Sequence, residues 1–144
     1  MAGNVIHRGP LDRVPRTINK PVSGALLPGT MVEDDGTNFV QITTAVDKRP
    51  LVLSNMQFKD QDILTAYTSG DTGVAYEVQP NDRFQVALAA ATYAVGDPLT
   101  VAANGRLAAA ATGNPIVAHF DDTPGAYTAG QLADVIWANS SAKA

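Results

Sequence analysis

The chain has 144 residues, of which 45% are apolar, with no cysteine and a net charge of −4. This length suits a single domain with a substantial core, and the lack of cysteine excludes disulfides, thiolate zinc sites and cysteine nucleophiles. No apolar run approaches the ~18–20 residues that a membrane-spanning helix needs, so we expect no membrane partner.

Charge is unevenly distributed along the chain. Residues 1–20 carry four basic side chains against one acid, a net charge of +3, whereas residues 21–144 carry six against thirteen, a net charge of −7. Nucleic-acid binding requires a basic face, and the acidic body argues against it. The first residues also lack the apolar core of a secretion signal, so we expect the chain to be made in the cytoplasm.

Residues 1–21 are predicted to form an extended basic arm. Pro10, Pro15 and Pro21 interrupt it, and a proline favours extended backbone in the residue before it. Terminal disorder is the alternative for this segment, although its scattered apolar side chains favour an ordered arm. We expect the arm to contact a partner through charges and apolar anchors, namely Arg8, Arg13, Arg16, Ile6, Leu11 and Val14.

Residues 22–144 are predicted to form one all-β domain. Glycine or proline recurs at intervals of about eight to twelve residues, a rhythm typical of a β-barrel or sandwich. Polar and apolar side chains alternate along residues 74–79 and 83–88, as in half-buried strands. Residues 50–54, 115–120 and 133–138 also read as strands. We expect a barrel or sandwich of about eight to ten strands.

The stretch "PGTMVEDDGTNFVQI" places Glu33, Asp34 and Asp35 beside Gly36. Calcium loops are rich in such residues, but they need acids at alternate positions and a glutamate at the twelfth, a spacing that is missing here. Asp-Gly is instead a preferred central pair of a type I′ hairpin turn, in which both residues have positive φ. We therefore predict a hairpin with a solvated acidic tip and no metal.

Residues 96–107, "GDPLTVAANGRL", repeat the pattern of this hairpin around Asn104 and Gly105. Each copy is followed by a proline and an apolar strand, at residues 50–53 and 115–118. The repeat reflects either two similar hairpins in one barrel or only the small vocabulary of β-hairpins. Because the second copy has no acid cluster, the turn does not require the acids.

Two alanine-rich stretches, residues 87–94 and 107–112, are ambiguous between strand and helix. Alanine favours helices, but each stretch is shorter than three turns and is closed by glycine, and short helices are marginal without packing. Residues 55–67 have room for a single helical turn.

Catalytic motifs are absent from the sequence. There is no H-E-x-x-H, G-x-S-x-G, P-loop or G-x-G-x-x-G pattern. The two histidines are His7 in the arm and His119 in a predicted strand, where a structural role is the more common one. We expect no catalytic residues, no metal site and no cofactor.

Several motifs in a fixed order resemble the capsid decoration (cement) proteins of tailed bacteriophages. They are the "PGT-h-V" opening, the "L-x-N" strand end, "I-x-x-A-Y-x-x-G-D" at residues 63–71 and "V-G-D-P-L" before a glycine hairpin. The similarity spans residues 26–120 and rests on order and spacing, because each motif alone is common in β-proteins. The basic arm departs from the family pattern, as does "QPNDRF" at 79–84, where a glycine is expected before Asp82.

This resemblance implies a small β-rich protein on the outer face of an assembled phage head, made in the host cytoplasm and without catalytic residues. Such proteins bind after head expansion and tie neighbouring major capsid protein subunits together, and several form trimers or dimers. The implied partners are therefore the major capsid protein and neighbouring copies of the chain itself.

Two rival functions remain open. One is another virion component, such as a tail or baseplate module or a glycan-binding β domain, for which only Trp137 and four tyrosines offer aromatic platforms. The other is an enzyme whose site assembles between subunits around a histidine and acids.

Two expectations concern variants of the chain. Deleting residues 2–20 is expected to abolish particle binding and to leave the body folded. Neutralising Glu33 and Asp34 is expected to leave folding and particle binding nearly intact, because both acids lie in the predicted solvated tip.

Overall fold

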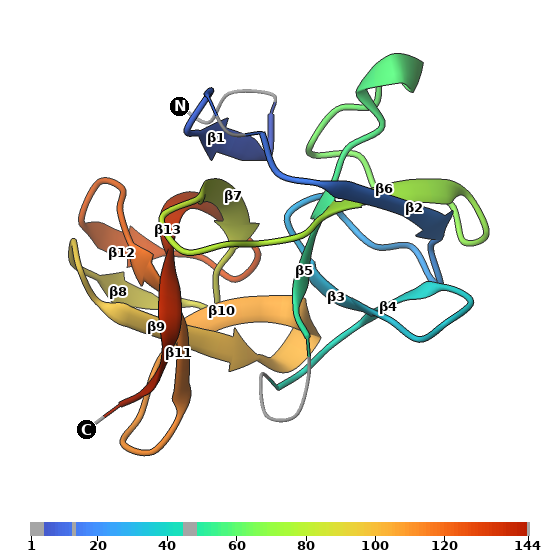
Figure 1. The fold of residues 1–144 in the computed structure, drawn as a ribbon. Helices are drawn as coiled ribbons and strands as arrows, with labels where there is room; N and C mark the ends of the chain where they lie inside the picture. The colour runs from blue at the N-terminus through green and yellow to red at the C-terminus, as the bar shows by residue number, and fades with distance from the viewer. Residues whose placement is uncertain (1–4, 13, 45–48, 144) are drawn as a thin grey trace.

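Antiparallel β-strands make up nearly all the regular structure (Figure 1). The computed structural model describes residues 5–12, 14–44 and 49–143, and these contain no α-helix, which confirms the all-β prediction. The arrangement is sandwich-like. The described strands are β1 (His7–Gly9), β2 (Thr17–Pro21), β3 (Met31–Asp34), β4 (Phe39–Gln41), β5 (Leu51–Ser54), β6 (Thr72–Tyr76), β7 (Arg83–Ala87), β8 (Ala91–Tyr93), β9 (Pro98–Ala102), β10 (Arg106–Ala109), β11 (Pro115–Phe120), β12 (Gly125–Tyr127) and β13 (Leu132–Ala142).

The strands form two main sheets and one small one. The larger sheet has the order β1-β7-β13-β11-β9-β10, and the other has the order β2-β6-β5-β3-β4. Strands β8 and β12 pair separately. Short 3₁₀ turns, η1 (Gln57–Lys59) and η2 (Ala103–Gly105), complete the elements, and η1 is the single helical turn expected within residues 55–67.

In the five-stranded sheet, β5 and the first half of β3 are buried on both faces. Met31 and Val52 join the larger apolar cluster, which also contains side chains of the six-stranded sheet such as Phe84 and Val135. From neighbouring positions, Val32 and Leu51 join a second, smaller cluster. Burial on both faces explains why residues 51–53 read as a continuous apolar run rather than an alternating one.

Both alanine-rich stretches form strands. Residues 87–94 contain the end of β7 and all of β8, and residues 107–112 contain most of β10. Their strand pairing with β12 and β9 outweighs the helical propensity of alanine. Tyr93 anchors β8, because its ring is buried and its hydroxyl donates to the carbonyl of Ala89 at 2.7 Å.

The repeat seen in the two hairpins extends to whole five-stranded units. If strands β2 to β6 are numbered one to five along the chain, their order across the sheet is first, fifth, fourth, second, third. Strands β7, β9, β10, β11 and β13 pair in the same sequence, with β8 and β12 as additions. Each unit also has one parallel bridge from the end of its first strand to its third, Val22 to Phe39 and Leu88 to Leu107. Chance similarity between two hairpins does not account for this shared topology.

One segment, residues 29–31, connects the two units. The Gly29 amide donates to Leu53 at 2.7 Å in one sheet, and its carbonyl accepts from Ala87 at 3.0 Å in the other. Gly29 has φ of 87°, and a Cβ there would lie 2.6 Å from the Leu132 side chain. Only glycine meets both conditions without strain.

The first hairpin forms as predicted, but its turn differs from the expected type I′. Asp34 pairs with Phe39, which leaves a four-residue loop in which Gly36 has positive φ and Asp35 does not. The Asp35 carboxylate accepts from the amides of Thr37 and Asn38, at 2.9 and 2.7 Å. Here the aspartate side chain adds to a backbone hydrogen bond across the tip, in which the Asp35 amide donates to the Asn38 carbonyl at 3.1 Å.

The acids of this hairpin also tie it to the N-terminal segment. Asp34 Oδ1 accepts from Lys20 Nζ at 2.7 Å and from the amide of Gly36 at 2.8 Å. These hydrogen bonds, from Lys20 first, lower the pKa of Asp34, and those from the amides of Asn38 and Thr37 lower the pKa of Asp35. The tip is therefore a bonded structural element, in contrast to the purely solvated tip that we predicted.

Replacing Lys20 with methionine is expected to raise the pKa of Asp34 toward its ordinary value of 3.8, because the largest cause of the lowering is lost. Stability from this carboxylate is present above that value and is lost as pH falls through the lowered pKa. A carboxyl-carbon NMR titration of the parent and the variant measures the pKa of Asp34, and urea unfolding at a series of pH values measures the stability. The pKa of Asp35 is expected to move less, because the amides of Asn38 and Thr37 are the largest causes of its lowering and the Lys20 charge is the smallest. An Asp34 pKa that does not move in the Lys20→Met variant would contradict the assignment.

The second hairpin requires glycine at its tip. Asn104 and Gly105 both have positive φ, and a Cβ on Gly105 would lie 2.6 Å from Thr30 Cγ2 and 2.8 Å from the Met31 carbonyl oxygen. Gly113 also has positive φ, but a Cβ there would meet nothing within 4 Å. The two glycines share backbone strain and differ in steric contact.

Gly105→Ala is therefore expected to destabilise the fold by about 1–3 kcal/mol more than Gly113→Ala, because overpacking adds to the shared backbone strain. Urea unfolding of the two variants measures the difference. Equal destabilisation would show that the hairpin tip does not press on residues 30–31.

Candidate interaction surface

The N-terminal segment supplies an outer strand to each main sheet. Strand β1 pairs with β7, and β2 pairs with β6 (Figure 1). The segment is extended, yet its strands are hydrogen-bonded to the body rather than separate from it. A deletion of residues 2–20 removes these strands along with any contact surface, so it cannot isolate a binding role.

Ile6 is not available as an anchor for a partner. Its side chain is fully buried in the larger apolar cluster of the chain itself. The backbone around it is held by Gln85, whose amide donates to the Ile6 carbonyl at 2.8 Å and whose side chain donates to the Val5 carbonyl at 2.6 Å. The expectation that Ile6 contacts a partner is therefore wrong, because its own core already buries it.

Arg8 forms an ion pair within the chain. Its Nε lies 3.3 Å from Asp134 Oδ1, and both side chains are about one-third exposed. Burial raises the pKa of Asp134, the Arg8 charge acts in the opposite direction, and Asp122 raises the pKa further. Arg8 thus compensates a half-buried carboxylate, and only part of its charge faces solvent.

Residues 10–12 and 14–16 form the exposed part of the segment, between β1 and β2. Leu11 and Val14 are 86% and 69% exposed, so two large apolar side chains of this segment are accessible to a partner. The Arg16 side chain is 84% exposed and lies 3.9 Å from Glu77. The structure thus brings Leu11, Val14 and Arg16 to one exposed loop, while Arg13 lies outside the described residues.

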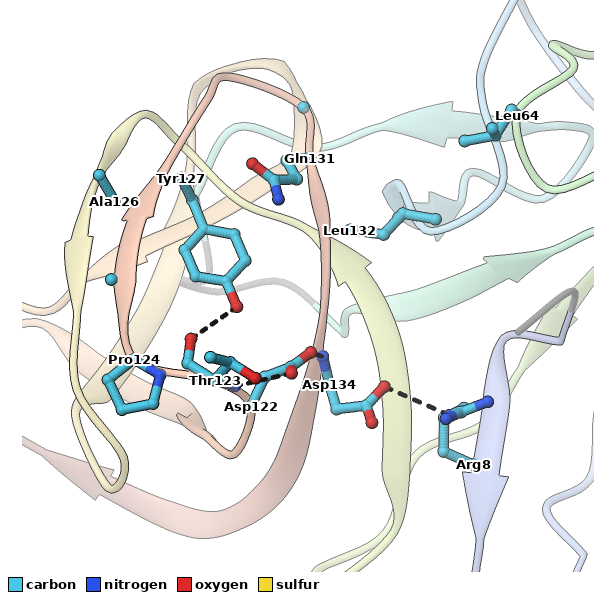
Figure 2. Close-up of a pocket in the computed structure, with 12 residues that line it drawn as sticks. Arg8, Leu64, Asp122, Thr123, Pro124, Ala126, Tyr127, Gln131, Leu132 and Asp134 are labelled. Carbon is cyan, nitrogen blue, oxygen red and sulfur yellow. Dashed lines mark hydrogen bonds and ion pairs between the residues drawn. The ribbon is translucent and has the colours of Figure 1, made fainter. Parts of the chain in front are cut away.

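A cavity of about 530 Å³ lies beside the Arg8–Asp134 pair (Figure 2). Tyr127 and Leu132 line it together with Leu64, which approaches from the loop before β6. Burial, together with the charges of Asp122 and Asp134, raises the pKa of the Tyr127 hydroxyl. The cavity combines apolar walls with a few polar groups.

The polar groups of this cavity are engaged within the protein. The Asp122 carboxylate accepts from the amides of Thr123 and Asp134, at 2.7 and 2.9 Å. The Tyr127 hydroxyl donates to the Thr123 carbonyl at 2.8 Å (Figure 2), and Gln131 Oε1 accepts from the amide of Thr128. These bonds hold the β11–β12 and β12–β13 loops in shape, so the carboxylates act as structural groups.

Neither histidine lies in an arrangement typical of catalysis. The His7 ring is close to Tyr76 and Phe84, and its buried Nε2 has no hydrogen-bond partner. His119 is partly exposed in β11, beside a depression whose lining contains no carboxylate. Among the residues that the structure describes, no group of three or more histidines and acids is placed to hold a metal ion. In the same residues, no helix is long and apolar enough to cross a membrane.

Sequence reasoning missed two residues that determine the place of the segment. The alternation places Gln85 on the face opposite Phe84, where polar side chains usually meet solvent, but Gln85 is 1% exposed and its side chain donates to the Val5 carbonyl. Asp134 was not singled out, although it lies between the apolar residues Ala133 and Val135 of a buried strand. A charged residue in such a setting is a signal of a buried partner.

Comparisons with known proteins support the fold. No family model matches the chain, and no curated protein does. Among solved structures, the chain is similar to the N base of the head fiber gp8.5 in bacteriophage phi29, with a TM-score of 0.58 and 13% sequence identity. The similarity covers 90% of this chain and 98% of that one. At this identity the likeness shows a shared fold over most of the chain.

Ile6→Ala is expected to lower the free energy of unfolding by about 2–5 kcal/mol, because it leaves a cavity in the core. Val14→Ala, in the exposed loop, is expected to change it by less than about 0.5 kcal/mol. Chemical denaturation of the two variants tests this contrast. A small loss for Ile6→Ala would mean that the N-terminal segment is not part of the folded core.

Proposed function

We propose that the chain is a structural protein of a bacteriophage virion that binds the outside of the head and stabilises the capsid by bridging major capsid protein subunits. The observation that carries this proposal is the fold, which is that of a phage head fiber base. The acidic body suits an outer surface in water, and the sequence resemblance to decoration proteins supports the same role.

The contact surface in this proposal is the exposed loop between β1 and β2. Burial of Leu11 and Val14 against a capsid subunit would each contribute about 1.5–3 kcal/mol. Arg16, together with Arg13, would meet an acidic capsid surface. Many copies on one lattice make modest single-site affinity sufficient.

The proposed role needs no catalysis and no cofactor. Its partners are the major capsid protein and neighbouring copies of the chain, arranged as a trimer or dimer at a local symmetry axis. Nucleic acid is not a partner in this proposal, since residues 21–144 carry a net charge of −7.

The alternative is another virion module, in the tail or baseplate, or a domain that binds glycans. The cavity beside Tyr127 is the feature that favours a glycan, because it offers an aromatic wall next to polar groups. Quantitative mass spectrometry of purified virions separates these roles. A copy number comparable with that of the major capsid protein supports the head role, whereas a handful of copies supports a tail part.

The loop is tested with two matched double variants. Leu11→Ser with Val14→Ser is expected to weaken binding to purified heads at least about tenfold, because two apolar anchors are lost. Leu64→Ser with Val95→Ser replaces the same residue types at similar exposure, 76% and 62%, and is expected to bind as the parent does. Co-sedimentation with heads measures both. Unchanged binding of the first variant would overturn the loop assignment, and absence of the chain from virions would overturn the virion role.

A further inference from the structure

The outer edge of β2 carries backbone groups that face away from its sheet. In the pairing with β6, the amide of Glu77 donates to the Arg16 carbonyl at 2.9 Å, and the amide of Val22 donates to the Asp71 carbonyl at 2.8 Å. Every second residue of an antiparallel strand bonds to the same neighbour. The N–H and C=O groups of Thr17 and Asn19 therefore point outward, and both residues are exposed.

Within the described residues, β2 is the last strand of its sheet on this side. Edge strands of this kind are templates for pairing with another chain. Proteins often block them with proline, and Pro21 does so only at the end of β2, because it lacks an N–H. Thr17 to Lys20 remain open to pairing.

The same position in the other unit is already filled by a strand. The equivalent parallel bridges, at Val22 and Leu88, align Thr17 with Arg83 and Asn19 with Gln85. Gly9 of β1 pairs with Arg83, and the amide of Gln85 donates to the Ile6 carbonyl at 2.8 Å. Strand β1 thus occupies on β7 the place that is empty on β2, so this fold accommodates an added antiparallel strand there.

The charges beside β2 define the chemistry of an occupant. Glu77 is shared by two guanidinium groups, with Arg49 at 3.1 Å and Arg16 at 3.9 Å. Arg16 is the more distant of the two guanidinium groups, and its side chain is 84% exposed, so it is accessible to a carboxylate of an added strand. Two residues further on, Ile18 is partly buried and packs against the smaller apolar cluster. An added strand would place one side chain opposite each of these two residues.

A second copy of the chain fits this edge less well. A register that sets Thr17 opposite Asn19 of the other copy also sets Arg16 opposite Lys20, and like charges directly across a strand pair are destabilising. The other two registers that pair the outward groups set Ile18 opposite Arg16 or Lys20, so neither gives Ile18 an apolar partner or Arg16 an acidic one. An acidic segment meets no such repulsion.

We propose that the outer edge of β2 binds an extended segment of a partner protein, antiparallel to β2, with an apolar residue facing Ile18 and an acidic residue two positions later facing Arg16. The segment adds a strand to the five-stranded sheet. This inference goes beyond the proposed function and does not depend on it, because strand addition at β2 and head binding by the β1–β2 loop are measured separately.

The probe is the peptide acetyl-Thr-Thr-Val-Thr-Glu-Thr-Thr-amide, titrated to about 2 mM against the full ¹⁵N-labelled chain. Saturable shifts are expected at the outward amides of Thr17 and Asn19, and slower hydrogen exchange at the same two positions. A peptide with lysine in place of glutamate is expected to bind at least about tenfold more weakly. No saturable shift at Thr17 and Asn19, or equal binding of both peptides, would overturn the proposal.

Matched variants test the backbone pairing directly. Asn19→Pro removes an outward N–H and leaves the inward bonds of β2 intact, so it is expected to abolish binding, whereas Asn19→Ala keeps the N–H and binds as the parent does. If Asn19→Pro does not fold, Arg16→Glu serves instead and is expected to prefer the lysine peptide. Binding that survives Asn19→Pro, or a charge reversal without a change in preference, would overturn the proposal. Self-association through β2, seen by sedimentation and lost in Asn19→Pro, would also overturn it in favour of a second copy.

Discussion

The two halves of the molecule meet at residues 29–31, and the rest of the structure depends on this junction. The backbone of Gly29 bonds to β5 on one side and to β7 on the other, and Met31 belongs to the apolar cluster that the two sheets share. The tip of the β9–β10 hairpin approaches the same segment at Thr30 and Met31. Residues 29–31 therefore contact both sheets and the tip of the β9–β10 hairpin. This also gives a physical reason for the "PGT" motif, in which a glycine must come close to another strand.

The repeated topology explains where the two proposed interaction surfaces lie. In each unit the edge of the third strand is approached by the chain that follows the first strand, as the bridges at Val22 and Leu88 show. The outer edge of the first strand, β2 in one unit and β7 in the other, is not approached in this way. The N-terminal segment lies differently at these two edges. Its strand β1 pairs with the outer edge of β7. The segment then continues as β2, which is the last strand of its own sheet among the described residues. The exposed loop with Leu11 and Val14 connects β1 to β2, so this loop and the open edge of β2 are neighbours in the chain.

Much of the fold was accessible from sequence, because alternation and turn residues are local signals. The hairpins at residues 31–42 and 98–109 and the strands at 51–54 and 115–120 follow from such signals. The sequence did not distinguish the buried Ile6 from the exposed Leu11, because both are aliphatic residues in the same proline-interrupted segment. Ile6 shares its apolar cluster with residues as distant in sequence as Trp137 of β13, and only the folded topology reveals this. The Arg8–Asp134 pair was missed for the same reason. The alanine-rich stretches were ambiguous because pairing partners, rather than intrinsic propensity, determine their state.

The burial of Ile6 also affects the order in which parts of the chain fold. Its cluster includes Phe84, Val135 and Trp137, and its strand β1 adds to an edge made by β7, which pairs in turn with β13. Strands β2 to β6 pair with one another, so that unit can begin to form while the chain is still being synthesised, since chains fold in units from the N-terminus. Residues 6–9, in contrast, must wait for strands near the C-terminus, and contacts so distant in sequence form slowly. Residues 6–9 are therefore expected to reach their final positions later than strands β2 to β6, which follow them in the chain.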